Sequence, residues 1–326
     1  MSAAPQRPSS VVLLFPGQGS QTPGMAADLA AAYPAASEVL ETVDAALGPT
    51  ASGVPLSRLM ADGPADALTR TDNAQPALLA HGAAVWAVLR PVLEQRVVAA
   101  AGHSLGEFTA YYAAGALTLP AAARLVRRRG ELMFESGTER PGAMAALLGD
   151  PDRPVEAICE EASREAGTVV PANYNCPGQL VISGEVAGVE RAMALAKAAG
   201  VKRAVRLPVS GAFHSPLMRE AQAGLDAALD AAELRDPEFP VYANVTAQPV
   251  VRATDARALL SQQLTAPVRW TETVAALAAA YPDALFLELG PGSVLAGLVR
   301  KAAPSVRVVS CGTAAQVGAL VAELQS

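Results

Sequence analysis

The sequence has few of the residues that disulfide-bonded and zinc-binding proteins need. Its 326 residues include three cysteines, without CxxC spacing, and three histidines, which are His81, His103 and His214. An odd number of isolated cysteines does not form a disulfide framework, and so few thiols and imidazoles disfavour a structural zinc site. We therefore expect no bound metal.

Basic charge is also scarce, and no apolar run is long. Lys and Arg number 25 against 31 Asp and Glu, a net charge of −6, so the chain lacks a positive field for nucleic acid. No stretch approaches the roughly 20 apolar residues that span a bilayer. The run from Val11 to Phe15 stops at Pro16, too early for a secretory signal. We expect a cytoplasmic protein without nucleic-acid or membrane partners, and a monomer by default.

Apolar residues are abundant and follow an α/β pattern. They make up 51% of the chain, against 17% charged residues, which is typical of a well-buried protein. Short apolar runs alternate with Ala/Leu-rich segments, as in a parallel sheet covered by helices. The clearest strands are expected over residues 11–15, 96–101, 241–244, 285–289 and 306–310. Helices are expected over 74–89 and 293–302, the latter with Ser293 as its N-cap.

The middle of the chain has a different pattern. From Gly142 the expected order is strand, helix, strand, strand, helix, strand. These elements are expected over residues 143–148, 154–166, 168–174, 179–183, 186–199 and 202–208. The order β-α-β-β-α-β is typical of a ferredoxin-like unit. We therefore expect an α/β catalytic domain made of residues 1–136 and 209–326, interrupted by a ferredoxin-like subdomain over residues 137–208.

The motif Gly102-His103-Ser104-Leu105-Gly106 follows an expected strand and precedes a helical run. It fits the pattern G-x-S-x-G, in which a tight turn exposes the serine hydroxyl. At the helix N-terminus, the helix dipole and the Leu105 amide can stabilise an oxyanion. The same residues also suit an ordinary glycine-rich turn, so the motif alone leaves both interpretations open.

A serine nucleophile needs a base, and three histidines limit the choice. His103 adjoins Ser104 at a sharp turn, where neighbouring side chains point in different directions, so we expect it to support the turn. His81 lies in an apolar helical run and is expected to be a packed or surface imidazole. His214 lies in a turn-rich segment after the middle unit, and loops on a rigid scaffold commonly hold catalytic groups. We therefore favour His214 as the base.

Arg129 is expected to point towards the core of the protein. In a helix over residues 121–134 it shares a face with four apolar residues, Leu125, Val126, Leu132 and Met133. A buried guanidinium is costly unless it meets an anion, which is either an Asp or Glu of the chain or a substrate carboxylate. The other arginines of the segment fall on another side and are expected to be solvated: Arg124, Arg127 and Arg128.

The segment from Phe15 to Gln21 follows the first expected strand, at the sheet edge where α/β proteins bind ligands. Its glycines can present the Gln18 amide as a second oxyanion donor. A phosphate-binding loop is the competing interpretation. The segment has neither a Gly-Lys-Ser/Thr ending nor a GxGxxG pattern, so we reject nucleotide binding here.

Seven motifs, taken in order, resemble those of the malonyl-CoA:acyl-carrier-protein transacylases, which are similar to polyketide synthase acyltransferase domains. They are FPGQGSQ from Phe15, GHSLGE from Gly102, RRG from Arg128, NYNCPGQ from Asn173, GAFHS from Gly211, QLTAPVRW from Gln263 and ELGPG from Glu288. The resemblance covers nearly the whole chain. It implies an α/β-hydrolase-like large domain with a parallel sheet and an inserted ferredoxin-like domain.

The resemblance also implies ping-pong acyl transfer. Ser104 is then the acylated nucleophile, His214 its base and Arg129 the clamp on the free malonyl carboxylate. The donor is a coenzyme A thioester, and the acceptor is an acyl carrier protein or a polyketide synthase carrier domain. No metal or redox cofactor is implied.

The resemblance also places five further residues in the site. Gln18 and Leu105 supply the oxyanion-hole amides. The main-chain carbonyl of Gln263 orients the histidine in place of a triad aspartate, because a neutral acceptor also fixes the tautomer. Asn173 and Asn175 match a family loop near the site, and their roles stay open.

The sequence partly indicates which acyl group is transferred. In the related polyketide domains, Ala-Phe-His at the histidine motif and an aliphatic residue after the serine accompany malonyl, so Phe213 and Leu105 imply malonyl. Phe213 would fill the space beside the acyl Cα where a methyl branch must go. Shape discriminates one methyl by only about 1 to 3 kcal/mol, so some use of methylmalonyl is expected.

Three alternatives remain beside malonyl transfer in fatty-acid or polyketide biosynthesis. A trans-acting polyketide acyltransferase with another dicarboxylic extender unit would share all these residues. A serine hydrolase shares the serine and histidine motifs, but it would need a triad acid and has no use for Arg129. A carrier-protein-binding module with a relic site would not be acylated on Ser104.

Overall fold

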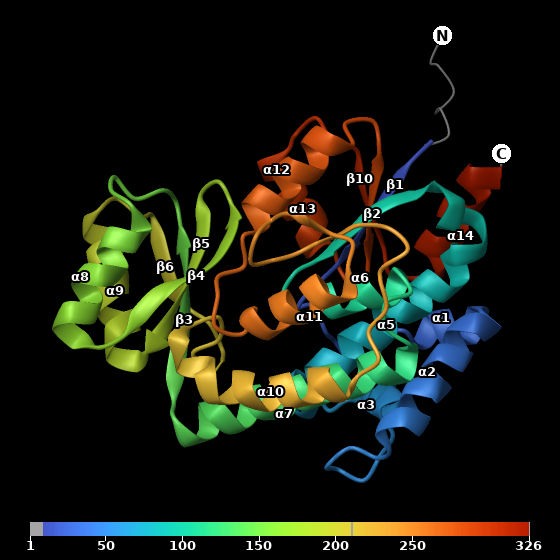
Figure 1. Ribbon diagram of the computed structural model, residues 1–326, viewed down its shortest axis with the longest axis horizontal. Coiled ribbons are helices and arrows are strands. Elements are labelled where there is room, and N and C mark those ends of the chain that lie inside the picture. Colours follow the sequence, from blue (N-terminus) through green and yellow to red (C-terminus); the bar gives the residue numbers. More distant parts are fainter. Residues whose placement is uncertain (1–8, 210, 326) are drawn as a thin grey trace.

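Strands from both ends of the chain join one six-stranded sheet in the computed structural model, which describes residues 9–209 and 211–325 (Figure 1). They are β1 (Val11–Phe15), β2 (Val97–Gly102), β7 (Val241–Tyr242), β8 (Pro249–Val250), β9 (Leu285–Leu289) and β10 (Val308–Cys311). The strand order is β10-β9-β1-β2-β7-β8. Neighbouring strands run parallel, except that β8 is antiparallel to β7.

The central strand β1 shows why the strands of this sheet have unbroken apolar sequences. All five of its residues are buried. Val11, Leu13 and Phe15 pack into one apolar core, and Val12 and Leu14 pack into a second core on the opposite face. Successive side chains of a strand point to opposite faces of the sheet. A strand whose two faces are both covered by helices therefore needs an apolar residue at every position.

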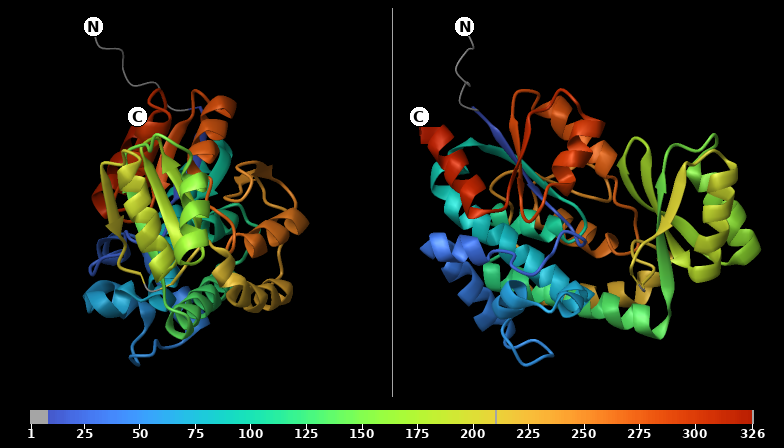
Figure 2. Two further views of the ribbon diagram at one scale, coloured as in Figure 1. Left: turned by 90° about the vertical axis from the view of Figure 1, so that its left-hand side faces the viewer. Right: turned by 180° about the vertical axis from the view of Figure 1, so that it is seen from behind.

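Helices cover both faces of the sheet (Figures 1 and 2). The first core contains residues of α1 (Ala27–Ala32), α2 (Pro34–Leu47), α3 (Leu56–Asp62), α4 (Ala65–Thr69), α5 (Thr71–Leu93), α6 (Gly106–Ala113), α7 (Leu119–Glu139), η2 (Pro216–Met218), α10 (Arg219–Ala231), α11 (Ala253–Gln262) and α14 (Ala314–Gln325). The second core contains residues of α12 (Trp270–Ala280) and α13 (Val294–Ala302). Within the described residues, one helical stretch, residues 71–96 from α5 through η1 (Glu94–Arg96), is long and apolar enough to cross a membrane, but 72% of its most apolar window is buried in the protein. It is a core helix.

The middle of the chain forms a separate antiparallel sheet with its own core. Its elements are β3 (Gly142–Leu148), α8 (Val155–Ala166), β4 (Val169–Cys176), β5 (Gln179–Glu185), α9 (Val186–Ala198) and β6 (Arg203–Arg206). The strand order is β4-β5-β3-β6, and α8 and α9 contribute to one apolar core with the sheet. The predicted α/β fold with a ferredoxin-like insertion is therefore confirmed. Tyr174 and Ala172 of β4 exchange main-chain hydrogen bonds with Val268, which ties this sheet to the large domain.

The predicted strands all exist, but some ends and one cap were wrong. The strand expected over 241–244 ends at Tyr242, and the one expected over 306–310 spans Val308–Cys311. The helix expected over 74–89 spans Thr71–Leu93. Ser293 precedes α13 without a capping hydrogen bond from its side chain. The Glu288 carboxylate of β9 accepts the Leu295 and Ala296 amides instead, because β9 ends shortly before α13 begins and leaves this carboxylate beside the helix N-terminus.

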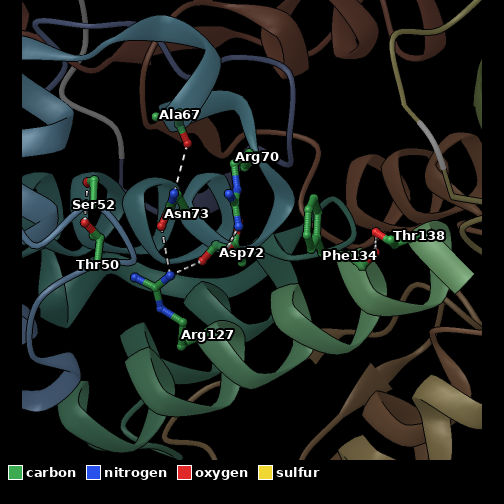
Figure 3. A network of polar contacts seen from close by, with 9 residues as sticks. All are labelled: Thr50, Ser52, Ala67, Arg70, Asp72, Asn73, Arg127, Phe134 and Thr138. Atoms are coloured by element: carbon green, nitrogen blue, oxygen red, sulfur yellow. Dashed lines mark hydrogen bonds and ion pairs between the residues drawn. The ribbon is translucent and has the colours of Figure 1, made fainter.

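Arg124 and Arg128 are exposed as expected, whereas the expectation for Arg127 was wrong. Its Nη1 donates to the Asp72 carbonyl over 2.6 Å and to Asn73 Oδ1 over 2.9 Å (Figure 3). Proline at position 76 has no N–H to pair with the carbonyl four residues earlier, so that carbonyl needs another donor. Gly130 lets α7 approach α5 closely enough to supply one, since a Cβ there would lie 2.7 Å from the Thr71 carbonyl.

Candidate active site

Ser104 lies in a tight turn between the end of β2 and the start of α6. Its φ is +52°, a left-handed backbone conformation that residues other than glycine rarely adopt unless the surrounding structure holds them in it. Both flanking glycines are required, because a Cβ at Gly102 would lie 1.9 Å from the carbonyl carbon of Gly106, and one at Gly106 would lie 2.0 Å from the Phe15 carbonyl oxygen. The turn directs the hydroxyl into a cavity at the carboxyl ends of the strands.

The structure brings Ser104 and His214 together from positions 110 residues apart in the sequence. Ser104 Oγ lies 2.8 Å from His214 Nε2, and His214 Nδ1 lies 2.8 Å from the Gln263 carbonyl oxygen. A carbonyl only accepts, so Nδ1 carries the proton and the Nε2 lone pair faces the serine. Burial, with the nearby Arg129 charge, lowers the pKa of His214 to about 3. The imidazole is therefore neutral and free to accept a proton.

Arg129 of α7 reaches the same hydroxyl. Its Nη2 lies 3.0 Å from Ser104 Oγ and 2.9 Å from Gln263 Oε1, and its Nη1 lies 2.8 Å from Gln75 Oε1. The residue is 1% exposed, which agrees with the expected apolar face of its helix. Burial lowers the pKa of its guanidinium to about 9, so it stays charged near neutral pH. Within the described part of the chain, its hydrogen-bond partners are neutral oxygens, not carboxylates.

A cavity of about 420 Å³ opens in front of these three side chains. The large domain contributes Gln18, Leu105 and Phe213 to its wall. The small sheet and the segment that follows it contribute Met144, Asn173 and Leu207. The volume falls in the range of small-molecule sites, and the location between the two sheets is typical of them.

The two expected oxyanion donors stand at this cavity. Gln18 and Leu105 both line it, and neither main-chain amide donates to another of the described residues. The Gln18 side chain is turned away, because its Nε2 donates to Thr71 Oγ1 over 3.3 Å. Leu105 lies at the N-terminus of α6, where the helix dipole favours negative charge.

The two asparagines of β4 lie near the site in different ways. Asn173 lines the cavity, and its buried Oδ1 has no partner among the residues that the structure describes. Asn175 Oδ1 lies 2.8 Å from His103 Nε2. His103 is therefore held beside the turn, as expected, rather than facing the Ser104 hydroxyl.

Comparison with known proteins gives one consistent answer. A family model described as an acyl transferase domain matches residues 12–325. The chain is 44% identical over 295 residues to the malonyl CoA-acyl carrier protein transacylase of Bacillus subtilis, covering 90% of each chain. It belongs to the acyl transferase family. The sequence resemblance to malonyl transacylases is thus confirmed at the level of the family.

Solved structures of similar transacylases share the fold over 97% of the chain. The acyl-carrier-protein S-malonyltransferase of Bartonella henselae superposes with a TM-score of 0.90 at 41% identity, covering 97% of this chain and 100% of that one. A malonyl-transacylase solved in complex with its type II polyketide synthase acyl-carrier protein superposes with a TM-score of 0.90 at 38% identity, covering 97% and 99%.

Two polar residues at the centre of this acyl transferase site were missed by sequence reasoning. Asn244, just after β7, accepts the Ser104 amide at Oδ1 over 2.7 Å and donates from Nδ2 to the Gly102 carbonyl over 2.7 Å. Glu107, three residues after Ser104, is fully buried and bonds to Asn244 and Gln263. A carboxylate inside the apolar segment GEFTAYYA was the available signal for Glu107.

The third histidine of the transferase lies outside the site. His81 of α5 is buried, and its Nε2 lies 2.8 Å from the Gly312 carbonyl oxygen. Burial lowers its pKa to about 4. It is a packed imidazole, which is one of the two alternatives expected from the sequence.

Proposed function

We propose that this protein transfers the malonyl group of malonyl-CoA to the phosphopantetheine thiol of an acyl carrier protein, for fatty-acid or polyketide biosynthesis. The observation that carries the proposal is the double contact of Ser104 Oγ, with a neutral imidazole at 2.8 Å and a buried guanidinium at 3.0 Å. The first contact suits a nucleophile, and the second suits an acyl group that ends in a carboxylate. The names of the relatives support the same reaction.

The first half-reaction loads the enzyme. Ser104 Oγ attacks the thioester carbonyl as its proton passes to His214 Nε2, and the oxyanion accepts hydrogen bonds from the Gln18 and Leu105 amides. The Gln263 carbonyl stabilises the imidazolium through Nδ1–H. Collapse of the tetrahedral intermediate breaks the C–S bond, and the departing coenzyme A thiolate takes the proton from His214. A malonyl-serine ester remains.

The second half-reaction moves the malonyl group from the enzyme to the carrier protein. The carrier thiol attacks the ester carbonyl while His214 accepts the thiol proton. Collapse breaks the bond to Ser104 Oγ, which recovers that proton and leaves a malonyl thioester on the carrier. Nucleophile, base and oxyanion donors all come from the chain, so the reaction as proposed requires no metal or redox cofactor. We also propose a cytoplasmic location for the protein.

Arg129 and Phe213 select the acyl group in this proposal. Arg129 exchanges its bond to the serine hydroxyl for a charged pair with the malonyl carboxylate. Phe213 lines the cavity and restricts the space beside the acyl Cα. An acetyl group would leave the buried charge unpaired, which costs free energy.

We propose that residues 137–208 form the inserted subdomain and that residues 1–136 and 209–326 form the catalytic domain. Residues 1–8, 210 and 326 of this division lie outside the described residues. In support, the elements from β3 to β6 run from Gly142 to Arg206 and share one apolar core. The subdomain would close one side of the acyl cavity through Met144 and Asn173.

Intact-protein mass spectrometry tests the function directly. The protein is incubated briefly with equimolar malonyl-, methylmalonyl- and acetyl-CoA, before and after addition of a carrier protein, with Ser104→Ala as the control. We expect a malonyl adduct that is lost from the enzyme and gained by the carrier. An adduct that passes only to water indicates a hydrolase, and the absence of any adduct indicates a relic site.

A further inference from the structure

Among the residues that the structure describes, Glu107 is the one that contacts both Asn244 and Gln263, the two structural supports of the site, through a single atom. Its Oε2 accepts the Asn244 main-chain amide over 3.1 Å and Gln263 Nε2 over 2.7 Å. The side chain is fully buried, and Oε1 has no partner among the described residues. A buried carboxylate is costly to keep, so its geometry needs an explanation.

The first of the two supports holds the nucleophile. The Asn244 amide group bridges the Ser104 main-chain N–H and the Gly102 carbonyl, each over 2.7 Å. These contacts span the turn in which Ser104 adopts its left-handed conformation. Glu107 fixes the main chain of Asn244, from which that bridge extends.

The second support holds the base and the clamp. Gln263 Nε2 donates to Glu107 and also to the Ser104 carbonyl over 3.0 Å, and Gln263 Oε1 accepts from Arg129 over 2.9 Å. The main-chain carbonyl of the same glutamine lies 2.8 Å from His214 Nδ1. Glu107 therefore holds the residue on which the His214 tautomer and one edge of the guanidinium depend.

The two oxygens of the carboxyl group have separate roles. Burial raises the pKa of Glu107 to about 7, opposed by its two hydrogen-bond donors and by the Arg129 charge. A proton bound near neutral pH resides on Oε1, which has no partner, so Oε2 accepts both hydrogen bonds in either protonation state. Hydrogen-bond acceptance at Oε2, rather than charge, is the property that the site uses.

We propose that Glu107 is a positioning residue for acyl transfer, which through Oε2 keeps the Ser104 turn and the Gln263 support of His214 in register. The inference rests on the proposed function, because the rate it concerns is the acylation of Ser104. It does not make Glu107 a catalytic residue, since its two partners stand between it and the reacting atoms.

Two variants separate hydrogen-bond acceptance from charge. Glu107→Gln keeps an oxygen at the place of Oε2 and puts an amide at the place of Oε1, as in the protonated acid. Glu107→Leu keeps a similar volume but accepts no hydrogen bond. Glu288→Gln is the matched control, because Glu288 is an equally buried carboxylate that binds the start of α13, away from the site.

The measurement is the single-turnover rate of Ser104 acylation by malonyl-CoA, with the acylatable fraction and the half-saturating concentration recorded for each variant. We expect Glu107→Gln to be about three- to tenfold slower than the wild type and Glu107→Leu at least about a hundredfold slower, because misplaced reacting groups cost roughly that much. The half-saturating concentration stays within about threefold in both, and Glu288→Gln keeps the wild-type rate.

Equal rates for the Gln and Leu variants would overturn the inference, as would a loss of rate explained by a smaller acylatable fraction. If the Leu variant does not fold, the Gln variant decides, because it keeps the acceptor at Oε2 and removes the charge. A rate within about tenfold of the wild type supports the inference, and a loss of about a hundredfold or more, which would mean that the site needs the charge, overturns it. A wild type that forms no malonyl-serine is a different result, because it rejects the proposed function itself.

Discussion

Arg129 donates a hydrogen bond from Nη2 to Ser104 Oγ over 3.0 Å. Its other side-chain partners are the amide oxygens of Gln75 and Gln263. A buried cation held by neutral oxygens gains more from an arriving carboxylate than one that already has an ion pair. In the proposed reaction, the pair therefore links the choice of acyl group to the serine that is acylated.

We expect Arg129→Ala to shift acyl preference from malonyl towards acetyl while Ser104 remains reactive. The malonyl carboxylate loses its charged partner, whereas acetyl no longer leaves a buried charge unpaired. Hydrogen bonds to charged groups contribute about 1.5 to 3 kcal/mol, so the malonyl-to-acetyl ratio should fall by about tenfold or more. Competition between the two thioesters, read as adduct masses, measures the ratio.

Arg128→Ala is the control for this experiment, because Arg128 lies on the same helix with an exposed side chain. It should leave the ratio unchanged. An Arg129→Ala protein that still prefers malonyl as strongly as the wild type would show that the carboxylate binds elsewhere.

We expect Phe213→Ser to widen acceptance to methylmalonyl-CoA. Phe213 is 7% exposed and lines the cavity, and its ring packs so closely on Gly211 that a Cβ there would lie 2.2 Å from the ring. The smaller serine leaves room for a methyl branch. Because one methyl is worth about 1 to 3 kcal/mol in such a pocket, the methylmalonyl-to-malonyl ratio should rise about tenfold or more.

Acylation with an equimolar mixture of the two thioesters checks this expectation. Phe134→Ser is a suitable control, since the Phe134 ring packs under the Arg70 guanidinium at 4.6 Å, outside the cavity lining (Figure 3). Equal ratios in the Phe213 variant and the wild type would refute the steric explanation.

What local patterns encode was predictable from the sequence. The strand-turn-helix setting of Ser104 depends on glycines within a few residues, and the inward direction of Arg129 follows from helical spacing alone. The order of elements in the middle unit likewise gave its fold. His214 was reached by elimination among three histidines, and the resemblance strengthened that choice.

What depends on packing between distant segments was not predictable. The Asn244 bridge to Ser104 joins residues 140 positions apart, and the hydrogen bond from Gln263 Nε2 to Glu107 Oε2 joins residues 156 positions apart. Arg127 was misjudged because a helical wheel describes one helix and not its neighbour. Proline at position 76 was the readable sign, since it removes the donor for the Asp72 carbonyl.

We expect the buried His81 to make the fold less stable as the pH falls below 6.5. Its folded-state pKa is about 4, lowered by burial, against 6.5 when exposed, so the unfolded chain binds the proton first. The contribution of the neutral His81 to the free energy of unfolding is therefore fully present above pH 6.5 and is lost as the pH falls towards 4. Between pH 7 and pH 5 this group alone should remove about 2 kcal/mol from the free energy of unfolding.

Urea unfolding of the wild type and His81→Gln at pH 7 and pH 5 measures this contribution. The glutamine amide can still donate to the Gly312 carbonyl but does not titrate, so its unfolding free energy should fall less over that interval. The two proteins should have equal slopes between pH 8 and pH 7, which is the internal control. Parallel curves at lower pH would mean that His81 is already accessible to protons in the folded state.

We expect Arg127→Leu to destabilise the protein, although sequence alone places this arginine in solvent. The change removes the donor to the Asp72 carbonyl and to Asn73 Oδ1, both at the start of α5. An unsatisfied buried carbonyl costs about 1 to 3 kcal/mol, and the free energy of unfolding should fall by about 2 kcal/mol. Denaturant unfolding at neutral pH measures the change.

Arg124→Leu provides the comparison on the same helix, because its side chain is exposed and the substitution is identical. Exposed substitutions usually change stability by no more than about 0.5 kcal/mol. Equal losses in the two variants would attribute the effect to added surface leucine. A loss confined to Arg127→Leu would attribute it to the Asp72 carbonyl, which proline at position 76 leaves without its helical donor. Asp72 lies in the first turn of α5, the turn that also carries Gln75 to Arg129.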